Sequence, residues 1–542
     1  MQVEITIKNY RCFQDSNPAR ITLSKGFVAF LGTNNSGKSS LLKFFYEFRD
    51  LFLTLSNIDA WSHIISNQQL SFSFPREVLD SQEVFCNINN RPLEIELRFI
   101  ESPPTINSLS FLNKIIITTI SRTTSDTVKI YLDNRLLKTD GNWIIYNTHL
   151  QNNRDIVVDI SYIIEIFRDL SKTIYIGPFR NALSLIPILD PGFMKSIDQQ
   201  YFNYFDIRVG RAFIQQWRRF KTGSSRKNNK ISLSITEDIK HIFEFNNLEI
   251  NSSDDDQTIK MFIDGNPYTL SELGSGLAQF FIVLANVAVE EPSYILIDEP
   301  ELNLNPLLQL DFLTTLGNYA KKGVLFATHS IGLARSSAEQ IYTVRKSNDG
   351  SEVREYEKNP HLSELLGELS FSTYKELGFN KILLVEGPTE IKTIQQFLRK
   401  HKKDHEIVLL PLGGSSLIND SSEPELVEIK RISNKISVLI DSERKSPDAK
   451  LESKRQAFLD TCQRIGISHH ALERRAIENY FSDRAVKLVK GSNFQKLQPY
   501  EKLADVPGWG KAENWKIARE MTVDELEGTD LGDFIKDLCK KE

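Results

Sequence analysis

The stretch that decides the fold is Gly32-Thr33-Asn34-Asn35-Ser36-Gly37-Lys38-Ser39. It fits the pattern G-x-x-x-x-G-K-[ST], and it lies between an apolar run at residues 27–31 and a helix-like run at residues 40–45. A phosphate-binding loop requires this order, because its two glycines let the backbone N–H groups converge on phosphate oxygens. All eight residues are therefore candidate nucleotide-binding residues. We expect Lys38 to reach the β- and γ-phosphates, Ser39 to ligate Mg²⁺, and the helix N-terminus to add its positive dipole end.

Length and composition limit the class of protein. The 542 residues suggest about three domains at roughly 100–200 residues each. A hydrophobic content of 40% is enough for sizeable cores. The net charge of -5 excludes a protein that is basic over its whole surface, so any contact with DNA must come from local patches.

Cysteine usage and hydropathy predict a cytoplasmic protein with no membrane partner. The four cysteines, at positions 12, 86, 462 and 539, form no C-x-x-C pair. This argues against a zinc site or a disulfide framework and fits a reducing compartment. The N-terminus lacks the pattern of a signal peptide, and no apolar run approaches the length of a membrane span.

A strand that ends in two acids lies far downstream of the phosphate loop. Residues 294–297 are apolar, and Asp298 and Glu299 follow them directly. This is the pattern of a buried parallel strand whose acids emerge at the edge where ligands bind. We expect Asp298 to hold the Mg²⁺ shell and Glu299 to orient or deprotonate the attacking water. Taken alone, such a pair is more often structural.

Two further motifs favour an ATPase. Residues 270–276 precede an apolar helix, and Ser275 there is small enough for a γ-phosphate to approach the helix N-terminus closely. The apolar strand 324–327 runs into Thr328-His329-Ser330, which places His329 to contact a γ-phosphate or the attacking water. A lone histidine would more often be structural. Four motifs in a fixed order make the functional interpretation stronger.

Together these motifs resemble the ABC-type ATPases of the SMC and RecF-like group. The loop at 32–39 matches Walker A, Asp298-Glu299 matches Walker B, and His329 matches the switch histidine. Residues 271–279 look like a degenerate signature motif, because the full Ser-Gly-Gly-Gln string is missing, and residues 301–305 match the D-loop. The resemblance implies that ATP is sandwiched between the phosphate loop of one subunit and the signature of another. It therefore implies a homodimer or a higher homo-oligomer.

The wide separation between Lys38 and Ser271 predicts an insertion in this ATPase. Residues 186–260 are mostly helical in pattern and are the candidate dimerisation element. The densest basic segment of the chain lies here, and it is either a phosphate-binding surface or a solvated helix face. Its members are Arg208, Arg211, Arg218, Arg219, Lys221, Arg226, Lys227 and Lys230. Arg180, upstream of the insertion, is equally well interpreted as a site residue or as part of a surface turn.

Acids also follow apolar strands in the C-terminal half. The run 381–385 leads into Glu386, with Glu390 four residues later, and the run 436–440 leads into Asp441-Ser442-Glu443. Asp441 and Glu443 are two residues apart, so both can reach one metal, and Glu386 would close the same site if its strand is adjacent and parallel. A cation removes the repulsion between such carboxylates. Oxygen-only ligands indicate Mg²⁺ or Mn²⁺. We count all four acids as candidate metal ligands, and Glu386, Asp441 and Glu443 also as catalytic.

This half resembles a Toprim domain, whose motif is a glutamate at one strand end and Asp-x-Asp at another. Glu386 and Asp441 match that motif, and Glu443 replaces its second aspartate. Further on, residues 475–480 look like the Glu-Asn-Tyr element of OLD-family nucleases, which implies that Glu478 is another metal ligand, although an alanine replaces an acid often found beside it. A basic residue often completes such sites, and we prefer Lys511 to Lys516 for a catalytic role.

The combination resembles the OLD family, which includes the Gabija nuclease and retron-associated effectors of anti-phage defence. The expected fold is α/β: an ABC-type P-loop ATPase with a helical insertion, followed by a Toprim α/β domain. The expected boundaries are 1–185 and 261–350 for the ATPase, 186–260 for the insertion and 376–542 for the Toprim nuclease domain. The resemblance implies ATP-dependent, metal-dependent cleavage of DNA. It also implies a possible defence partner, either a reverse transcriptase with its nucleic acid or a helicase-like protein.

The sequence leaves two other interpretations open. The first is an ATP-gated sensor of DNA or of a partner protein, in which the Toprim fold is a non-catalytic scaffold. Acids at separate strand ends argue against it. The second, a topoisomerase or a primase, is weak, because the chain shows neither a tyrosine-bearing DNA gate nor a template-binding module.

Overall fold

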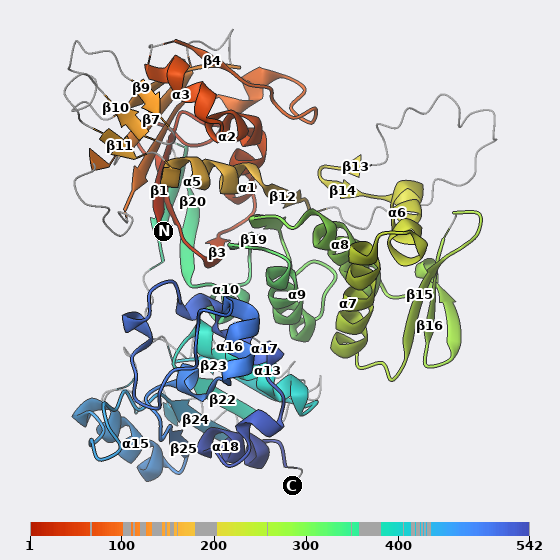
Figure 1. Ribbon diagram of the computed structural model, residues 1–542, viewed down its shortest axis with the longest axis vertical. Coiled ribbons are helices and arrows are strands. Elements are labelled where there is room, and N and C mark those ends of the chain that lie inside the picture. Colours follow the sequence, from red (N-terminus) through yellow and green to blue (C-terminus); the bar gives the residue numbers. More distant parts are fainter. Residues whose placement is uncertain are drawn as a thin grey trace. The chain divides into compact units, whose positions relative to one another are not determined.

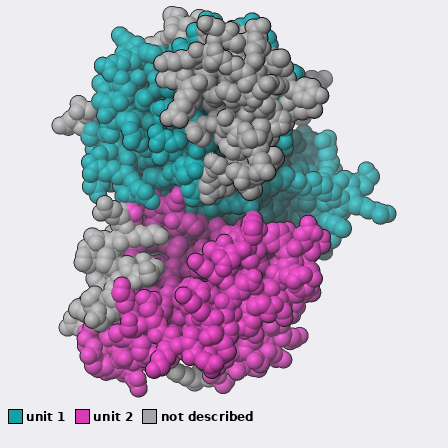
Figure 2. Space-filling view, turned by 60° about the vertical axis from the view of Figure 1, so that its left-hand side comes forward, with its two compact units in different colours: residues 1–329, 342–355 teal, residues 330–341, 356–542 magenta. Residues whose placement is uncertain are grey.

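The computed structural model describes residues 2–65, 68–100, 110–111, 114–119, 126–132, 144–146, 149–151, 157–159, 161–178, 203–256, 258–347, 350–356, 381–404, 406–412, 418, 423, 426–427, 430 and 435–540. Arg180, one of the candidate site residues, lies outside these residues. The chain divides into two compact units (Figure 2). Unit 1 comprises residues 1–329 and 342–355, and unit 2 comprises residues 330–341 and 356–542.

The central sheet of unit 1 has the strand order β12-β18-β19-β3-β20-β21. Of its strands, β12, β19, β3 and β20 are labelled in Figure 1. Its strands are β3 (Gly26–Leu31), β12 (Thr173–Ile176), β18 (Tyr294–Asp298), β19 (Gly323–Thr328), β20 (Gln340–Ser347) and β21 (Gly350–Glu355). β12, β18, β19 and β3 run parallel. Almost all residues of β3, β18 and β19 are buried, which is why these strands form continuous apolar runs in the sequence. The carboxyl ends of parallel strands meet at one edge of a sheet, so the loops after β3, β18 and β19 lie at the same edge.

A second, antiparallel sheet in unit 1 has the order β2-β1-β5-β7-β8-β4. Its strands are β1 (Val3–Lys8), β2 (Ala19–Leu23), β4 (Leu70–Ser71), β5 (Glu94–Phe99), β7 (Lys114–Thr119) and β8 (Thr127–Leu132). Val3, Ile5 and Ile7 are buried, as the alternation of the N-terminal sequence predicts. They share one apolar core with residues of α1 (Lys38–Glu47), α2 (Arg49–Leu55), α3 (Ile58–Ile65) and α5 (Ser161–Ser171). This core fixes α1, and hence the loop before it, on the sheet.

The remaining elements of unit 1 form smaller sheets and a group of helices. The sheets are β6 (Ser110–Phe111) with β9 (Ile144–Tyr146), β10 (His149–Gln151) and β11 (Val157–Asp159); β13 (Asn203–Tyr204) with β14 (Ile207–Arg208); and β15 (Leu248–Ser252) with β16 (Ile259–Ile263) and β17 (Asn266–Thr269). The helices are α6 (Gly210–Thr222), α7 (Arg226–Ile242), α8 (Ser275–Glu290) and α9 (Pro306–Asn318), with the 3₁₀ turns η1 (Ser81–Val84) and η3 (Leu270–Glu272).

The segment 186–260 is less helical than its sequence pattern suggested. α6 and α7 are present, but β13, β14, β15 and the start of β16 also lie in this range, and residues 186–202 lie outside the described part. β15 has the period of a strand, because Leu248 and Ile250 are buried while Glu249 between them is exposed. The Nε1 of Trp217 on α6 donates to the backbone oxygen of Ile250 at 3.2 Å, so the helix packs on this small sheet.

Unit 2 is built on a parallel sheet with the order β23-β22-β24-β25. Its strands are β22 (Lys381–Val385), β23 (Ile407–Pro411), β24 (Ile436–Ile440) and β25 (Ser468–Ala471). Its helices are α10 (Ile331–Ser337), α13 (Pro388–Lys400), α15 (Ser453–Ile465), α16 (Asp483–Lys490), α17 (Asn514–Glu520) and α18 (Asp530–Leu538). The 3₁₀ turns are η6 (Ile477–Tyr480), η7 (Leu503–Asp505), η8 (Lys511–Glu513) and η9 (Asp524–Leu526).

The strand order of unit 2 determines where its acids meet. The chain passes from β22 to β23 on one side and from β24 to β25 on the other, so the order reverses between β22 and β24. β22 lies beside β24 and parallel to it, as the acidic pattern of the sequence required. Ligands of open α/β sheets bind at such a reversal point, outside the carboxyl ends of the strands. Pro388 then begins α13, where its missing N–H leaves no donor unsatisfied.

Two expectations about the chain as a whole can be compared with this structure. All four cysteines are free. Among the described residues, no helix is long and apolar enough to cross a membrane.

Candidate functional site

The phosphate loop joins β3 to α1, and steric contacts require its glycines. Gly37 has a φ of 108°, and a Cβ on it would lie 2.7 Å from the Sγ of Cys12. A Cβ on Gly32 would lie 2.2 Å from the backbone oxygen of Val344. Asn35 has a φ of 58°, a conformation that asparagine adopts more readily than most residues. The loop conformation therefore depends on the small residues that the sequence motif specifies.

Lys38 is the first residue of α1, and its side chain points back over the loop. Its Nζ lies 2.9 Å from the carbonyl oxygens of both Gly32 and Thr33, and only 4% of the residue is exposed. Burial lowers the pKa of Lys38, and the acids that follow β18 counteract this effect. An ammonium that is held by loop carbonyls can exchange them for the oxygens of a phosphate group.

The loop also keeps polar groups for a ligand. The hydroxyl of Ser36 is fully buried and has no hydrogen-bond partner in the described part of the chain. Thr33, Asn34, Asn35 and Ser39 are exposed. Buried polar groups in folded proteins are nearly always hydrogen-bonded. The Ser36 hydroxyl and the exposed backbone of the loop thus fit a bound phosphate group.

The acids after β18 reach the same edge of the sheet. Asp298 is the last residue of β18 and is only 3% exposed. Glu299 has a φ of 51°, and its N–H donates to the backbone oxygen of Ala327 at 2.8 Å. A left-handed glutamate costs on the order of 1–3 kcal/mol and persists only where the surrounding structure imposes it. Here the neighbouring strand β19 imposes it, and the turn directs the carboxylate of Glu299 toward His329.

His329 lies between an acid and a base. Its Nε2 is 3.1 Å from the Oε1 of Glu299 and 3.2 Å from the Nζ of Lys38. One ring nitrogen carries either a proton or a lone pair, so it cannot donate to Glu299 and accept from Lys38 at the same time. The structure thus brings together three residues that the sequence analysis selected from three separate motifs.

Glu301 positions His329, and the sequence analysis gave it no such role. Its Oε1 accepts hydrogen bonds from the hydroxyl of Thr328 at 2.7 Å and from the backbone N–H of His329 at 2.8 Å. The sequence showed Glu301 only as the first residue of the expected D-loop. Its contact with His329 depends on the pairing of β18 with β19, which the sequence does not show.

Ser275 is exposed at the first position of α8. A Cβ on the following residue, Gly276, would lie 2.9 Å from the backbone oxygen of Asn303, so the start of α8 packs closely on the loop after β18. Among the described residues, the hydrogen bonds of the phosphate loop do not include Ser275.

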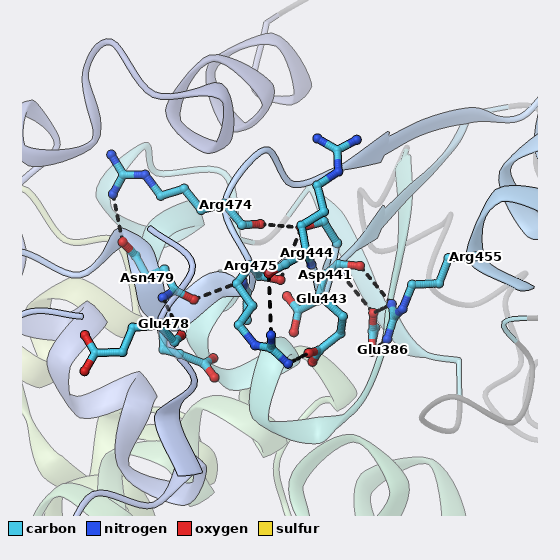
Figure 3. Close-up of polar contacts among 12 residues, drawn as sticks. Glu386, Asp441, Glu443, Arg444, Arg455, Arg474, Arg475, Glu478 and Asn479 are labelled. Carbon is cyan, nitrogen blue, oxygen red and sulfur yellow. Dashed lines mark hydrogen bonds and ion pairs between the residues drawn. The ribbon is translucent and has the colours of Figure 1, made fainter. Parts of the chain in front are cut away.

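In unit 2, Glu386 and Asp441 meet at the reversal point of the sheet. Glu386 follows β22, and its Oε1 accepts the backbone N–H of Asp441 at 2.9 Å. Arg455, on α15, forms an ion pair with Glu386 and donates from Nη1 to the backbone oxygen of Asp441 at 2.8 Å (Figure 3). The sequence analysis did not select Arg455, because nothing in the pattern of α15 distinguishes it from a surface arginine.

Three carboxylates, among them that of Asp441, surround the ammonium group of Lys511. Its Nζ lies 3.6 Å from the Oε1 of Glu390, 3.6 Å from the Oδ2 of Asp441 and 3.8 Å from the Oε1 of Glu478. These acids come from three places in the chain: the first turn of α13, the end of β24 and the turn η6. Burial and neighbouring carboxylates raise the pKa of Asp441 well above its usual range, and burial also raises the pKa of Glu478. Burial lowers the pKa of Lys511, but the three carboxylates outweigh this and raise it.

Glu443 has an arginine partner of its own. It has a φ of 53°, its N–H donates to the backbone oxygen of Arg475 at 2.8 Å, and its carboxylate forms an ion pair with the Arg475 guanidinium (Figure 3). The sequence analysis expected Asp441 and Glu443 to reach one metal, because they are two residues apart. The left-handed turn after β24 changes the direction of the chain at Glu443, so the two carboxylates have different partners.

The Glu478-Asn479-Tyr480 element has a structural part and a part that faces the acids. The Nδ2 of Asn479 donates to the backbone oxygens of Gln498 at 2.6 Å and Glu501 at 3.0 Å, and the hydroxyl of Tyr480 donates to the Oδ1 of Asp530 at 2.6 Å. These contacts fix the turn η6. Glu478 is thereby held beside Asp441 and Lys511 with only 3% of its side chain exposed.

The charges of this group fit a hard divalent cation. When all four carboxylates are ionised, they face two basic groups, which leaves two negative charges. The carboxylates are those of Glu386, Glu390, Asp441 and Glu478, and the basic groups are those of Arg455 and Lys511. All the acids offer oxygen, the ligand that Mg²⁺ and Mn²⁺ prefer. Within the described residues, however, no group of three or more histidine, cysteine, aspartate or glutamate side chains is arranged to hold a metal ion. The donor chemistry fits, while the carboxylates stand around an ammonium group instead of at metal-binding distances.

Some of the basic residues near α6 and α7 are bound within unit 1. Arg218 forms an ion pair with Asp256, Lys221 donates to the backbone oxygen of Ile250, and Lys227 forms an ion pair with Glu291. The exposed basic residues of this segment are Arg208, Arg211, Arg219, Arg226, Lys227 and Lys230. The basic segment of the sequence thus presents fewer free cations than its composition suggests.

Two family models match the chain. The model described as "AAA domain, putative AbiEii toxin, Type IV TA system" matches residues 27–335, which is more than half of the 542 residues. A second model, described as "AAA domain", matches residues 4–46. Both matched ranges contain the phosphate loop, and the longer one also contains Asp298, Glu299 and His329. No curated protein is significantly similar to the chain.

Solved structures of SMC heads are also similar to the chain. The SMC head domain from Thermotoga maritima is 15% identical, and the match covers 66% of this chain and 100% of that one with a TM-score of 0.34. The Smc head domain with an extended coiled coil from Pyrococcus furiosus, bound to the C-terminal domain of ScpA, is 10% identical, with coverage of 69% and 100% and the same TM-score of 0.34.

Proposed function

This chain belongs to the family of AAA domains that includes the putative AbiEii toxin of type IV toxin–antitoxin systems. We propose that unit 1 contains its ATPase site and that unit 2 is a divalent-metal-dependent DNA endonuclease under nucleotide control. One observation carries the nuclease proposal. Carboxylates from α13, β24 and η6 converge on one cationic group at the reversal point of a parallel sheet. The resemblance of this half to the Toprim domains of OLD-family nucleases supports the same reaction.

In the ATPase, the residues act on the phosphates and on water. Lys38 would exchange the loop carbonyls for phosphate oxygens, and Ser39 and Asp298 would hold the Mg²⁺ that accompanies the nucleotide. Glu299 would orient the attacking water and accept its proton. The Nε2 of His329 can donate to Glu299 when it carries a proton, or accept from Lys38 when it does not. His329 would change between these two partners as Glu299 accepts the proton. The exposed position of Ser275 supports an arrangement in which a second copy of the chain completes the nucleotide site.

In unit 2, Glu390, Asp441 and Glu478 would hold the divalent cation, which would activate water and stabilise the leaving oxygen. Glu386 positions Asp441 by accepting its backbone N–H, and Arg455 balances the charge of Glu386. Lys511 would hold an oxygen of the scissile phosphate. Glu443 would be a metal ligand only in a state in which its carboxylate has left Arg475.

The substrate we propose is DNA, and the biological role is that of a defence effector. The exposed basic residues Arg211, Arg219, Arg226 and Lys230 are available for contacts with the phosphate backbone. The family description supports a role in a toxin–antitoxin or defence system. In that role a reverse transcriptase with its nucleic acid, or a helicase-like protein, would be the partner.

The test is cleavage of supercoiled plasmid by the full-length protein with Mg²⁺ or Mn²⁺, with and without ATP. Asp441→Asn should abolish nicking and leave ATP hydrolysis intact, because the two sites lie in different units. Asp483→Asn is the matched control, since half-buried Asp483 on α16 forms an ion pair with Lys487 and accepts the backbone N–H of Lys496 at 3.1 Å, with no ion pair to the acidic cluster among the residues described. Nicking by Asp441→Asn at the rate of the unmodified protein would refute the nuclease assignment. Equal nicking with and without ATP would refute nucleotide control.

A second function is favoured by the same cluster. Arg455 and Lys511 already balance half of its negative charge, as they would in an ATP-gated sensor of DNA or of a partner with a non-catalytic scaffold. The plasmid assay separates the two. A sensor would bind DNA or a partner in an ATP-dependent way and leave the plasmid intact at every metal concentration.

A further inference from the structure

Lys511 occupies the point toward which the acids of unit 2 are directed. Its Nζ is at nearly the same distance, 3.6, 3.6 and 3.8 Å, from three carboxylate oxygens that belong to Glu390, Asp441 and Glu478. These distances exceed the 2.7–3.2 Å of an N–H···O hydrogen bond. They also exceed the roughly 2.0–2.6 Å of Mg²⁺ or Ca²⁺ bound to oxygen. Charge therefore holds the ammonium at this point, rather than a fixed hydrogen-bond geometry.

The lysine and the acids differ in how freely they can move. The side chain of Lys511 is 42% exposed, whereas those of Asp441 and Glu478 are each 3% exposed. The Oδ1 of Asp441 also accepts the backbone N–H of Ile477 at 3.1 Å, and the Oε2 of Glu478 faces the Nδ2 of Asn514 at 3.4 Å. Each of these two carboxylates thus has an oxygen that faces a donor group of the protein other than Lys511. A change of cation in this cluster therefore begins with the movement of one long, partly solvated side chain, and the carboxylates then close in to metal-binding distance.

A divalent ion and this ammonium cannot occupy the point together. Two cations a few ångströms apart repel each other strongly in a partly buried site. The single positive charge of Lys511 leaves the cluster two negative charges in excess, so the acids attract a divalent ion more strongly than they attract the lysine. Lysine is suited to the exchange, because its ammonium is a compact point charge on a flexible stem.

We propose that Lys511 is an internal counter-ion that occupies the divalent-cation position of unit 2 and is displaced when the metal binds. This inference rests on the metal site of the proposed function. The displaced ammonium is then free to bind a phosphate oxygen of the substrate, on the solvent side of the acids. Metal binding and the availability of Lys511 for substrate are therefore one event.

The experiment measures Mn²⁺ binding to the full-length protein by calorimetry and by the electron paramagnetic resonance of free Mn²⁺. Lys511→Met should bind Mn²⁺ at least tenfold more tightly than the unmodified protein, because the ion no longer displaces a cation. Lys511→Gln, which keeps the length and polarity of the side chain more closely, should show a gain of the same sign. Lys516→Met is the matched control, five residues further on and beside Trp515, and its affinity should stay unchanged. Equal or weaker Mn²⁺ binding by both Lys511 variants would overturn the proposal.

A second measurement, of the melting temperature, separates a change in metal affinity from a loss of folding stability in these variants. Without metal, Lys511→Met should melt at a lower temperature than the unmodified protein, and saturating Mn²⁺ should raise its melting temperature by more. The double variant Lys511→Met/Asp441→Asn should lose the gain in affinity, and a gain that persists there would place the metal elsewhere and refute the inference. Plasmid cleavage is scored separately. If the protein shows this Mn²⁺ competition but never cleaves DNA, the proposed function fails and the inference stands. If it cleaves DNA without the competition, the inference fails and the proposed function stands.

Discussion

Replacing Arg455 by leucine should weaken the sheet of unit 2 by leaving a buried carboxylate without its partner. Arg455 and Glu386 have side chains that are 9% and 14% exposed, and the guanidinium also donates to the backbone oxygen of Asp441 at 2.8 Å. Breaking a buried ion pair by removing one partner costs about 3–5 kcal/mol, because the remaining charge is uncompensated. We expect the lower end, about 3 kcal/mol, since part of the Glu386 side chain still reaches solvent.

Hydrogen exchange of the full-length protein measures this loss where it occurs. Peptides that cover β22 and β24 report the free energy of opening of this sheet. At 1.36 kcal/mol per tenfold change, a loss of about 3 kcal/mol accelerates their exchange by roughly 100-fold. Peptides from unit 1 serve as an internal reference. The control variant is Arg464→Leu on the same helix, whose ion pair with Glu423 is exposed and is expected to contribute less than about 1 kcal/mol.

Two additions test the cause. In the Arg455→Leu background, Glu386→Gln should recover most of the lost protection, because it removes the uncompensated charge. Mn²⁺ should recover part of it, because a cation in the cluster replaces the charge of Arg455. If Glu386→Gln makes the double variant less stable still, packing and not charge explains the effect, and the reasoning fails.

Three other predictions concern separate parts of the chain. Glu299→Gln should bind ATP but hydrolyse it at least 100-fold more slowly, because the water loses its base, and turnover at the normal rate would remove Glu299 from that role. Gly37→Ala should abolish binding of a fluorescent ATP analogue, because alanine disfavours a φ of 108° and its Cβ would lie 2.7 Å from the Sγ of Cys12; unchanged binding would contradict the loop conformation. Asp530→Asn should destabilise the protein at pH 7 by about 1–3 kcal/mol in chemical denaturation. Burial alone would raise the pKa of Asp530, but hydrogen bonds from His470 and Tyr480 lower it, so its stabilisation is present above the unfolded pKa near 4 and is lost as the pH falls below it. A stability difference that is constant from pH 7 to about pH 3 would contradict this account.

The residues that meet at the candidate nucleotide site of unit 1 could largely be predicted from the sequence. The phosphate loop, the acids after β18 and the histidine after β19 are each marked by a local pattern, and the parallel sheet brings their strand ends to one edge. Glu301 was missed as a positioning residue, because its bonds to Thr328 and His329 cross between two strands. Residues 248–252 were wrongly included in a mostly helical segment, although their burial alternates with the period of a strand.

The acidic site of unit 2 was predictable in its strands but not in its partners. The sequence predicted that Glu386 would join Asp441 if their strands were adjacent and parallel, and β22 and β24 are paired in this way. Spacing alone suggested that Glu443 would join them. A left-handed turn at Glu443 directs its carboxylate to Arg475 instead. The backbone conformation of one residue cannot be inferred from the fact that two acids lie two positions apart in the sequence.

The sequence by itself determined which residues lie at strand ends, since apolar runs, glycines and terminal acids are local features of the chain. Only the tertiary structure decided which charges face each other. Lys511 lies 121 residues beyond Glu390 and 33 beyond Glu478, yet the fold places its ammonium group within 4 Å of both. The physical reason is that electrostatic partners are selected by distance through space, and this distance depends on strand order and turn conformation that no local pattern encodes.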